Sequence, residues 1–549
     1  MLQASGRPAH DITRIDIFPA VRTQSLSTYR AGCKLENRGR FPAATAAENC
    51  ARECERFANS RVWIFAVTAL GVITLLAASA SFRGAIPLDA RTHQDLTNIG
   101  VHFELSRHAI LLGPFCAIFE MIAGAPDYRL TAGATLFWLF FLISAARFWR
   151  SGGEGPSAWR QLLASCGAAL AVCLAIALYL GFAVLVPLPS WSLVVADRTW
   201  LIADLHSHTS QSHDGIASCE ENLAYHRERG YTVVAITEHF SPMGRLFDQC
   251  NGGSDSRHPQ IVPGVELSAV GPFGGRRFLL ALGVSPGLAL PYELLYQSAE
   301  VGHFIASIHE AGGAVLALAY RLGPRDVEPF ADAGIDGVEI ANFGHPYLSG
   351  ELKNALLEAQ LSRHLALVAD SDWHGWSGFA RTWTLIKPAD APGLNSAYTE
   401  VIRALRARDS DRVIPVVLHP MGAQSLSAAV VSPINESIRY FRELSPPRLL
   451  SWWVWTLAVT WLGATLASFG YRPVSCLGGA VLMVLAVGML IRGGQLIASS
   501  LSAASSPFQW KVGTLSCGLG FISLLLASAW LMPTLRMLRW RIALRTRPG

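Results

Sequence analysis

Six uncharged apolar stretches constrain the fold of this chain more than any other feature of its sequence. They cover residues 62–82, 130–146, 162–186, 449–469, 474–491 and 512–532. Each is close to the roughly 20 residues that a helix needs to cross the hydrocarbon core of a membrane. The chain is 51% hydrophobic and its mean hydropathy is +0.32, which is too apolar for an ordinary soluble protein. We therefore expect a multi-pass integral membrane protein in contact with the lipid bilayer.

A seventh apolar stretch, 109–125, is interrupted by Glu120. An acidic side chain at the centre of a membrane helix costs about 2.5–3.5 kcal/mol on the scale from insertion experiments. We expect Glu120 to lie near the membrane surface or to face a neighbouring helix, so that the first cluster has three or four spans. A transporter function would rest on Glu120 alone, because the other spans contain no charge.

The apolar stretches divide the chain into segments. We expect a disordered, Arg-rich tail at 1–61 without a signal peptide, a membrane cluster at 62–190 and a soluble domain at 198–420. A linker at 421–448, a second cluster of three spans at 449–535 and a basic tail at 536–549 follow. The net charge of +5 is modest for this length and gives no sign of nucleic-acid binding. Nothing in the sequence indicates the oligomeric state.

The distribution of arginines predicts which side of the membrane the soluble domain occupies. The basic tail directly follows the last span, and basic residues in that position usually stay in the cytoplasm. Three spans separate the tail from the soluble domain, which predicts an extracytoplasmic domain in a membrane of the bacterial inner-membrane type. The residues Arg439, Arg442 and Arg448 at the domain's exit favour the opposite orientation. Cys219 and Cys250 could form a disulfide in an oxidising compartment, or remain two free thiols.

Residues Asp204 to Gly215 contain several possible metal ligands directly after the first membrane cluster. His206 and His208 are two residues apart, so on a strand both imidazoles point to the same face and can bind one cation. The apolar residues before them predict a short strand, and the polar residues after them predict a loop. In barrel enzymes the active site lies at the C-terminal ends of the strands, which is the position expected for these ligands.

Three further clusters of ligand-type residues follow predicted strands in the same domain. Glu238 and His239 come after an apolar run at 232–236, Glu266 follows Pro263 and Gly264, and Asp372 and His374 follow an apolar run at 365–369. A single histidine or acid after a strand is usually a hydrogen-bonding loop residue. Four such clusters in one domain predict a metal centre.

In their order and spacing, these motifs resemble the polymerase and histidinol phosphatase (PHP) superfamily of metal-dependent phosphoesterases. The resemblance covers residues 200–419 and none of the spans. It implies an α/β fold, a distorted (β/α) barrel inserted between the two clusters of transmembrane helices. It also implies two ligand sets: one ion held by His206, His208, Glu266 and Asp372, and a second held by Asp214, His239 and His374. Asp214 is preferred to His213 because the family's ligand stands directly before a glycine.

The sequence departs from the family at two other ligand positions. Where trinuclear members have histidines, this chain has Phe278 and the pair Ala319 and Tyr320. The resemblance therefore implies a centre with at most two ions. Two outer residues are candidates for catalytic roles: Glu238, which could orient an imidazole or be solvated, and Arg321, which could clamp a phosphate or lie on the surface.

The candidate ligands suit manganese, zinc or iron. Two such ions can activate a water molecule and stabilise a phosphoryl displacement, so no serine or cysteine nucleophile is required. We expect a metal-dependent hydrolase of a small phosphate ester. The alternatives are hydrolysis of a carboxylic or carbamate ester, and a catalytically silent metal-dependent sensor that signals through the spans.

Overall fold

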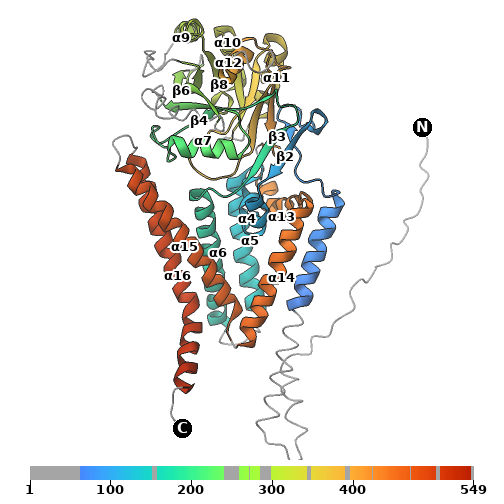
Figure 1. Ribbon diagram of the computed structural model, residues 1–549, viewed down its shortest axis with the longest axis vertical. Coiled ribbons are helices and arrows are strands. Elements are labelled where there is room, and N and C mark those ends of the chain that lie inside the picture. Colours follow the sequence, from blue (N-terminus) through green and yellow to red (C-terminus); the bar gives the residue numbers. More distant parts are fainter. Residues whose placement is uncertain are drawn as a thin grey trace, which may run out of the picture. The chain divides into compact units, whose positions relative to one another are not determined.

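Six helices in the described part of the computed structural model are long and apolar enough to cross a membrane (Figure 1). They are Val62–Ser79, α5 (Tyr128–Arg150), α6 (Ala158–Leu185), α14 (Pro446–Ser468), α15 (Pro473–Ser500) and α16 (Pro507–Arg545). Each overlaps one of the six predicted stretches. Large apolar side chains on these helices are exposed, among them Phe141, Leu170 and Val484. Such a surface fits contact with lipid rather than with water.

The structure describes residues 62–150, 158–239, 259–270, 273–284, 298–342, 348–389, 396–422, 425–469, 471–501 and 507–545. The predicted tail at 1–61 lies outside these residues, as does Cys250. The chain divides into two compact units, Met1–Phe65 and Ala66–Gly549. The second unit contains the sheets and the candidate functional residues.

The seventh apolar stretch forms two short helices, α3 (Arg107–Leu111) and α4 (Gly113–Ala123). The 11 residues of α4 extend about 16 Å at 1.5 Å per residue, which is half of a roughly 30 Å hydrocarbon core. The stretch is therefore too short to span. Glu120 is buried in α4 and its Oε2 accepts a hydrogen bond of 2.7 Å from Arg448 of α14, so it faces a neighbouring helix, one of the two predicted positions.

Replacing Glu120 with alanine is expected to destabilise the protein by about 3–5 kcal/mol, because it leaves the buried guanidinium of Arg448 without its counter-charge. A fall in the midpoint of thermal unfolding in detergent would measure the loss. The double variant Glu120→Leu with Arg448→Met removes both charges and should recover most of it. Equal destabilisation by the single and double variants would show that packing, rather than the ion pair, is what the site requires.

Ten strands form one curled sheet in the second unit. Across the sheet the order is β1 (Leu88–Asp89), β12 (Val413–Val417), β11 (Thr382–Ile386), β4 (Leu201–Ser207), β5 (Val233–His239), β6 (Gln260–Val270), β7 (Arg276–Leu282), β8 (Ala314–Leu318), β9 (Gly337–Ala341) and β10 (Ala366–Ala369). Strands β4 to β6 are parallel, β7 is antiparallel to both neighbours, and β8 to β10 are parallel again. The fold is mixed α/β, as the sequence predicts.

The sheet curls into a half-barrel whose edge strand β10 lies beside β11. Thr384 of β11 makes this contact: its Oγ1 accepts from the backbone N–H of Ala369 at 2.9 Å and donates to the carbonyl of Ala369 at 3.0 Å. Backbone ladders do not close the sheet among the described strands, where β1 and β10 are edges. Side-chain hydrogen bonds, rather than a full ring of paired strands, therefore bring β10 next to the strands that end at the candidate ligands.

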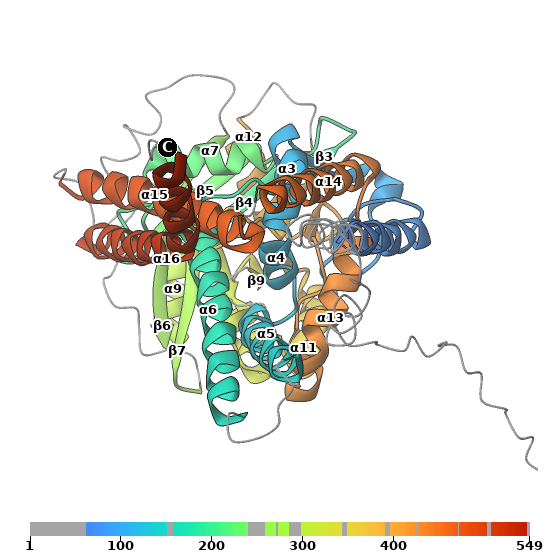
Figure 2. The ribbon, with the colours of Figure 1, turned by 90° about the horizontal axis from the view of Figure 1, so that it is seen from below.

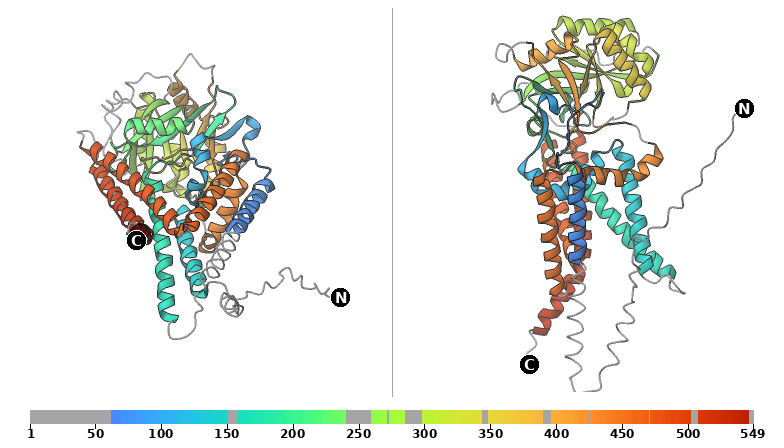
Figure 3. Two further views of the ribbon diagram at one scale, coloured as in Figure 1. Left: turned by 60° about the horizontal axis from the view of Figure 1, so that its bottom comes forward. Right: turned by 90° about the vertical axis from the view of Figure 1, so that its right-hand side faces the viewer.

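Helices cover both faces of the curled sheet. On β8, Val315 and Ala317 belong to the core that includes α9 (Ser298–Glu310), α10 (Val327–Ala333) and α11 (Gly350–Arg363), whereas Leu316 and Leu318 face the core that includes α12 (Ala397–Arg406). This alternation is the period of two expected for a strand buried on both faces. Helix α7 (Cys219–Glu228) begins with a capping box between Ser218 and Glu221. The apolar helices of this unit lie on one side of the sheet (Figure 3).

Two segments differ from the organisation that the sequence predicts. Residues 88–105 of the expected membrane cluster contain β1, which pairs with β12, and β2 (Val101–Leu105), which pairs with β3 (Trp191–Val195) in a separate two-stranded sheet. The expected linker at 421–448 contains α13 (Leu426–Arg442), whose Tyr440 is buried against Ala117 of α4. The first segment adds β1 to the ten-stranded sheet, and the second packs α13 against α4.

Candidate metal centre

Three neighbouring parallel strands, β4, β5 and β6, bring the first candidate ligands together. His206 lies on β4, which ends at Ser207, and His208 follows it directly. His239 ends β5 and is paired in register with Glu266 of β6. Because neighbouring strands are about 4.8 Å apart, side chains in register on β5 and β6 lie next to each other. The Nε2 atoms of His206 and His208 are 3.1 Å apart, as predicted for two imidazoles on one face.

The loop after β10 adds Asp372 and His374 from the far edge of the sheet. Its backbone is hydrogen-bonded to β4: Asp372 N donates to His206 O, and His208 N donates to Trp373 O, each at 2.8 Å. Asp372 has a φ of 51°, a left-handed conformation that aspartate and asparagine tolerate better than most residues. Tertiary contacts hold this conformation, which turns the carboxylate towards His206.

Four side chains have the geometry of one metal site. From His206 Nε2, the Glu266 Oε2 is 3.2 Å away and the Asp372 Oδ1 is 3.3 Å away. From His208 Nε2, the same two oxygens are 3.3 and 3.5 Å away. Ligand atoms around a tetrahedral ion, bound at about 2.0–2.1 Å, lie about 3.3–3.4 Å apart. These four residues therefore fit one divalent ion without rearrangement.

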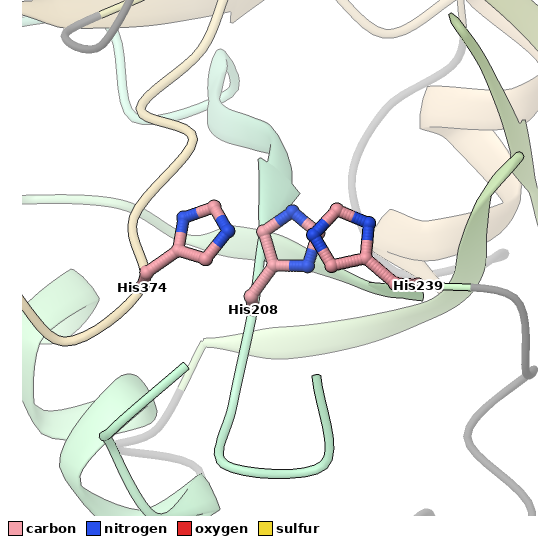
Figure 4. A group of neighbouring side chains, drawn as sticks. All are labelled: His208, His239 and His374. Carbon is pink, nitrogen blue, oxygen red and sulfur yellow. The ribbon is translucent and has the colours of Figure 1, made fainter. Parts of the chain in front are cut away.

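Asp214, His239 and His374 form a second group. Asp214 Oδ1 lies 3.3 Å from His239 Nε2 and 3.4 Å from His374 Nε2. This oxygen is buried, and none of the described residues donates a hydrogen bond to it, which is the environment of an oxygen that binds a cation. The rings of His374 and His239 lie on either side of His208, with centroids 4.1 and 4.4 Å from it (Figure 4). The two groups are therefore adjacent.

The glycine after Asp214 is required by close packing. A Cβ atom on Gly215 would lie 2.0 Å from the carbonyl oxygen of Thr209, so any other residue would push the loop open. The loop folds back at this point and directs Asp214 towards His239 and His374. His213, the residue before Asp214, is 70% exposed and its Nε2 lies 3.8 Å from the Asp214 carboxylate.

Outer carboxylates orient two of the imidazoles. Glu339 of β9 is buried and its Oε2 lies 2.7 Å from His206 Nδ1, while its Oε1 accepts a hydrogen bond of 2.6 Å from Asn342. Such a partner directs the opposite ring nitrogen towards the ion. Glu339 is not among the residues predicted from the sequence, although an acidic residue inside an apolar strand is a signal that could have identified it.

The predicted residue Glu238 contacts one of the candidate ligands only through another side chain. It is buried, so it is not solvated. It accepts hydrogen bonds from Thr209 and from Ser212 Oγ, the latter at 2.5 Å, and the same Oγ lies 3.0 Å from His208 Nδ1. Glu238 thus positions His208 through Ser212 and does not face the ligand atoms itself.

The charges in the cluster compensate one another. Burial alone lowers the pKa of His206, but the carboxylates of Asp372 and Glu339 raise it well above the ordinary histidine value. Burial also lowers the pKa of His374, which Asp372 and Asp214 raise to about 9. Protonated imidazoles therefore supply the positive charge that these buried carboxylates need. A cation bound here would displace those protons.

Phe278 and Tyr320 stand at the two positions where the resemblance to the PHP superfamily would place further histidine ligands. The rings of Phe278 and Tyr320 are stacked with centroids 6.1 Å apart, and Ala319 is buried beside them. Arg321 is exposed, and its guanidinium carbon lies 5.8 and 5.4 Å from these two ring centroids. Neither aromatic side chain offers an imidazole or a carboxylate.

Replacing Glu339 with glutamine is expected to weaken metal binding by about 10–100-fold, the usual effect of losing an outer carboxylate partner. Glutamine keeps the size of the side chain but removes the charge that faces His206 Nδ1. Competition with a fluorescent chelator would measure the change. Glu328 is an exposed glutamate, and Glu328→Gln serves as the control. Equal affinities in the Glu339 variant and in this control would exclude the orienting role.

Comparisons with known proteins give structural likenesses of low similarity. No family model and no curated protein sequence matches the chain. Part of it is similar to a provisionally assigned metal-dependent phosphoesterase from Bifidobacterium adolescentis, with 18% identity, 38% of this chain and 96% of that chain covered, and a TM-score of 0.28. For PsfC from Pseudomonas syringae the sequence identity is 16%, 43% of this chain and 98% of that chain are covered, and the TM-score is 0.30. For an amidohydrolase from Chromobacterium violaceum with bound sulfate and no metal, the sequence identity is 18%, 38% of this chain and 96% of that chain are covered, and the TM-score is 0.27. Scores of this size assign neither a family nor an activity.

Proposed function

We propose that this chain is a membrane-anchored, metal-dependent hydrolase that cleaves a phosphate ester with a dinuclear centre. The observation that carries the proposal is the convergence of seven ligand-type side chains from β4, β5 and β6 and from the loops after β4 and β10: His206, His208, Asp214, His239, Glu266, Asp372 and His374. A mixed set of imidazoles and carboxylates suits manganese, zinc or iron. Membrane anchoring is supported by the six long apolar helices.

Each group of ligands would hold one ion, and Glu266 lies between the groups. Its Oε2 is 3.3 Å from both His208 Nε2 and His239 Nδ1. Two bound ions would supply an activated water and stabilise the charge that develops on the phosphoryl group. The chain's own residues fix the ligand atoms in place through Glu339, Ser212 and the backbone hydrogen bonds of the Asp372 loop. We assign Arg321 the role of binding a phosphate oxygen at the rim.

The test uses the purified full-length protein, loaded with manganese or zinc, and a panel of aryl phosphomonoesters, phosphodiesters and carboxylic esters. We expect hydrolysis of the phosphate esters and competitive inhibition by inorganic phosphate. Hydrolysis of carboxylic esters without inhibition by phosphate would show that the substrate is a carboxylic ester and not a phosphate ester. If no ester is hydrolysed and His206→Ala alters ligand binding alone, the domain is a metal-dependent sensor.

We propose further that the soluble domain lies outside the cytoplasm of a bacterial cell, as the basic C-terminal tail predicts. Cys219 is disulfide-bonded, which supports an oxidising compartment. Protease added to sealed inside-out inner-membrane vesicles is expected to leave the domain intact and to remove the C-terminal tail. Degradation of the domain under conditions that preserve the tail would reverse the orientation.

A further inference from the structure

An apolar cavity connects the candidate metal centre with the membrane helices. Its volume is about 380 Å³, and its lining includes Phe119 of α4, Tyr128 of α5, Leu180 and Val184 of α6, and Asp372 and His374 of the metal centre. Cavities that bind small molecules usually measure about 300–1,000 Å³ and are mostly apolar, with a few polar groups at one place. Here the polar groups include two candidate metal ligands.

Helices α4, α5 and α6 lie close to one another (Figure 2), and residues of all three line the cavity together with residues of the loop after β10. Helix α6 has 28 residues and is about 42 Å long, about 12 Å longer than the hydrocarbon core of a bilayer. Leu180 and Val184 belong to its last two turns, and Tyr128 and Ala132 to the first two turns of α5. If these helices span the membrane, the cavity lies near the level of the lipid headgroups.

Direct contacts hold the metal-site loops against the ends of the spans. Ser377 N, three residues after His374, donates to the carbonyl of Val184 in α6 at 2.7 Å. Gln509 in the first turn of α16 donates to the carbonyl of Ile216, two residues after Asp214, at 2.9 Å. The loops that carry Asp214 and His374 are therefore held directly against α16 and α6.

The chemistry of the lining selects one kind of occupant. Phe119, Leu180 and Phe379 offer hydrocarbon surface to an occupant of the cavity. At the other end the two metal ligands offer a place for an anion bound to cations. Arg381 adds a buried positive charge to the lining. A water-soluble phosphate ester would leave the apolar part unused, whereas a lipid with a phosphate headgroup matches both ends.

We propose that this cavity binds a hydrocarbon chain of a membrane lipid whose phosphate ester lies at Asp372 and His374. The inference rests on the proposed phosphoesterase function and names its substrate class. In the reaction the oxygen of water bonds to phosphorus, the bond from phosphorus to the leaving alcohol oxygen breaks, and that oxygen takes a proton from the water. The alcohol and the phosphate are the products, and no oxidant or further reactant is needed.

Binding of n-alkyl phosphonates tests the inference, because their carbon–phosphorus bond is not hydrolysed. Calorimetric titration of the manganese-loaded full-length protein in amphipathic polymer would compare methyl, butyl, hexyl, octyl and decyl phosphonate. Burial of each added CH₂ group is expected to lower Kd about fourfold until the cavity is full. Enzymatic hydrolysis of short aryl phosphates is measured on the same preparation.

Two variants fill the cavity, and one matched variant does not. Leu180→Trp and Ala132→Leu add bulk to the lining, whereas Leu174→Trp makes the same change as the first variant on the exposed surface of α6. The ratio of Kd for methyl phosphonate to Kd for decyl phosphonate should fall at least tenfold in the first two and stay at the wild-type value in Leu174→Trp. Metal content of all three should equal that of the wild type, since none replaces a candidate ligand.

The outcomes separate this inference from the function on which it rests. If Kd does not depend on chain length while short phosphate esters are hydrolysed, the lipid inference is wrong and the phosphoesterase stands. A chain-length dependence that both cavity variants retain would place the hydrocarbon chain elsewhere and also overturn the inference. Chain-length-dependent binding without hydrolysis of any phosphate ester would overturn the phosphoesterase function alone.

Discussion

Asp372→Asn is expected to lower kcat/KM for phosphate esters by about 10³-fold, because several kcal/mol of metal-dependent stabilisation depend on this carboxylate. Asp372 Oδ1 lies 3.3 Å from His206 Nε2, 3.5 Å from His208 Nε2 and 3.6 Å from His374 Nδ1. Like Glu266, Asp372 lies close to histidines of both groups. The asparagine side chain has the same shape but lacks the negative charge, so binding of at least one ion should be lost.

The fold should survive this substitution. Asparagine tolerates the left-handed backbone of residue 372 as well as aspartate does, and the hydrogen bond from the backbone N–H to His206 O does not involve the side chain. Kinetics would be measured together with metal content and resistance to proteolysis. Asp332→Asn changes an exposed aspartate paired with Arg363 and serves as the control. Full turnover and full metal content in the Asp372 variant would remove it from the ligand set.

Removal of metal is expected to abolish hydrolysis, and addition of manganese or zinc to restore it with at most two ions per chain. Three tightly bound ions would contradict the assignment of Phe278, Ala319 and Tyr320 as residues that hold no metal. Apparent metal affinity should rise with pH between about 6.5 and 9, because the raised pKa values of His206 and His374 mean that a proton must leave each imidazole before the ion binds. Competition with a chelator at several pH values measures this dependence.

The same pKa shifts predict the stability of the metal-free protein. The pKa of His374 is about 9 in the folded chain and about 6.5 in the unfolded chain. A raised folded pKa contributes stability that is complete below pH 6.5 and is lost as the pH rises through 9. The unfolding midpoint of metal-free protein should therefore fall across this range, while that of metal-loaded protein falls less. A constant midpoint without metal would show that the imidazole charges do not stabilise the cluster.

Local features of the sequence predict the spans and the candidate ligands well. A membrane span requires only a run of apolar residues of sufficient length, and all six predicted runs are long apolar helices. The ligand motifs are local too, because each lies on or soon after its own strand. The prediction that Glu238, His239 and Glu266 follow their strands is wrong, because β5 and β6 extend through these residues. All seven predicted ligand residues lie in one cluster, and Glu238 lies just behind it. Their binding of metal stays a prediction.

The features that the sequence did not reveal depend on contacts between distant residues. Glu120 and Arg448 are 328 positions apart, and neither residue identifies the other. Strand β1 has two residues, too few for a detectable pattern, and pairing with β12 alone defines it. Helix α13 looked like a linker because its apolar stripe matters only when α4 and α5 lie beside it. Arg321 has no sequence pattern that places it, and it lies over the rings of Phe278 and Tyr320.

The sequence by itself determined that the chain has six long apolar helices and one α/β domain with a cluster of candidate metal ligands, because length, hydropathy and motif order are properties of short segments. Only the tertiary structure decided which residues position these candidate ligands and which cavity lies beside them. Glu339 reaches His206 because β9 is curled towards β4, and the apolar cavity exists because α4, α5 and α6 meet beside the Asp372 loop. Such arrangements arise from the packing of segments far apart in the chain, which no local pattern records.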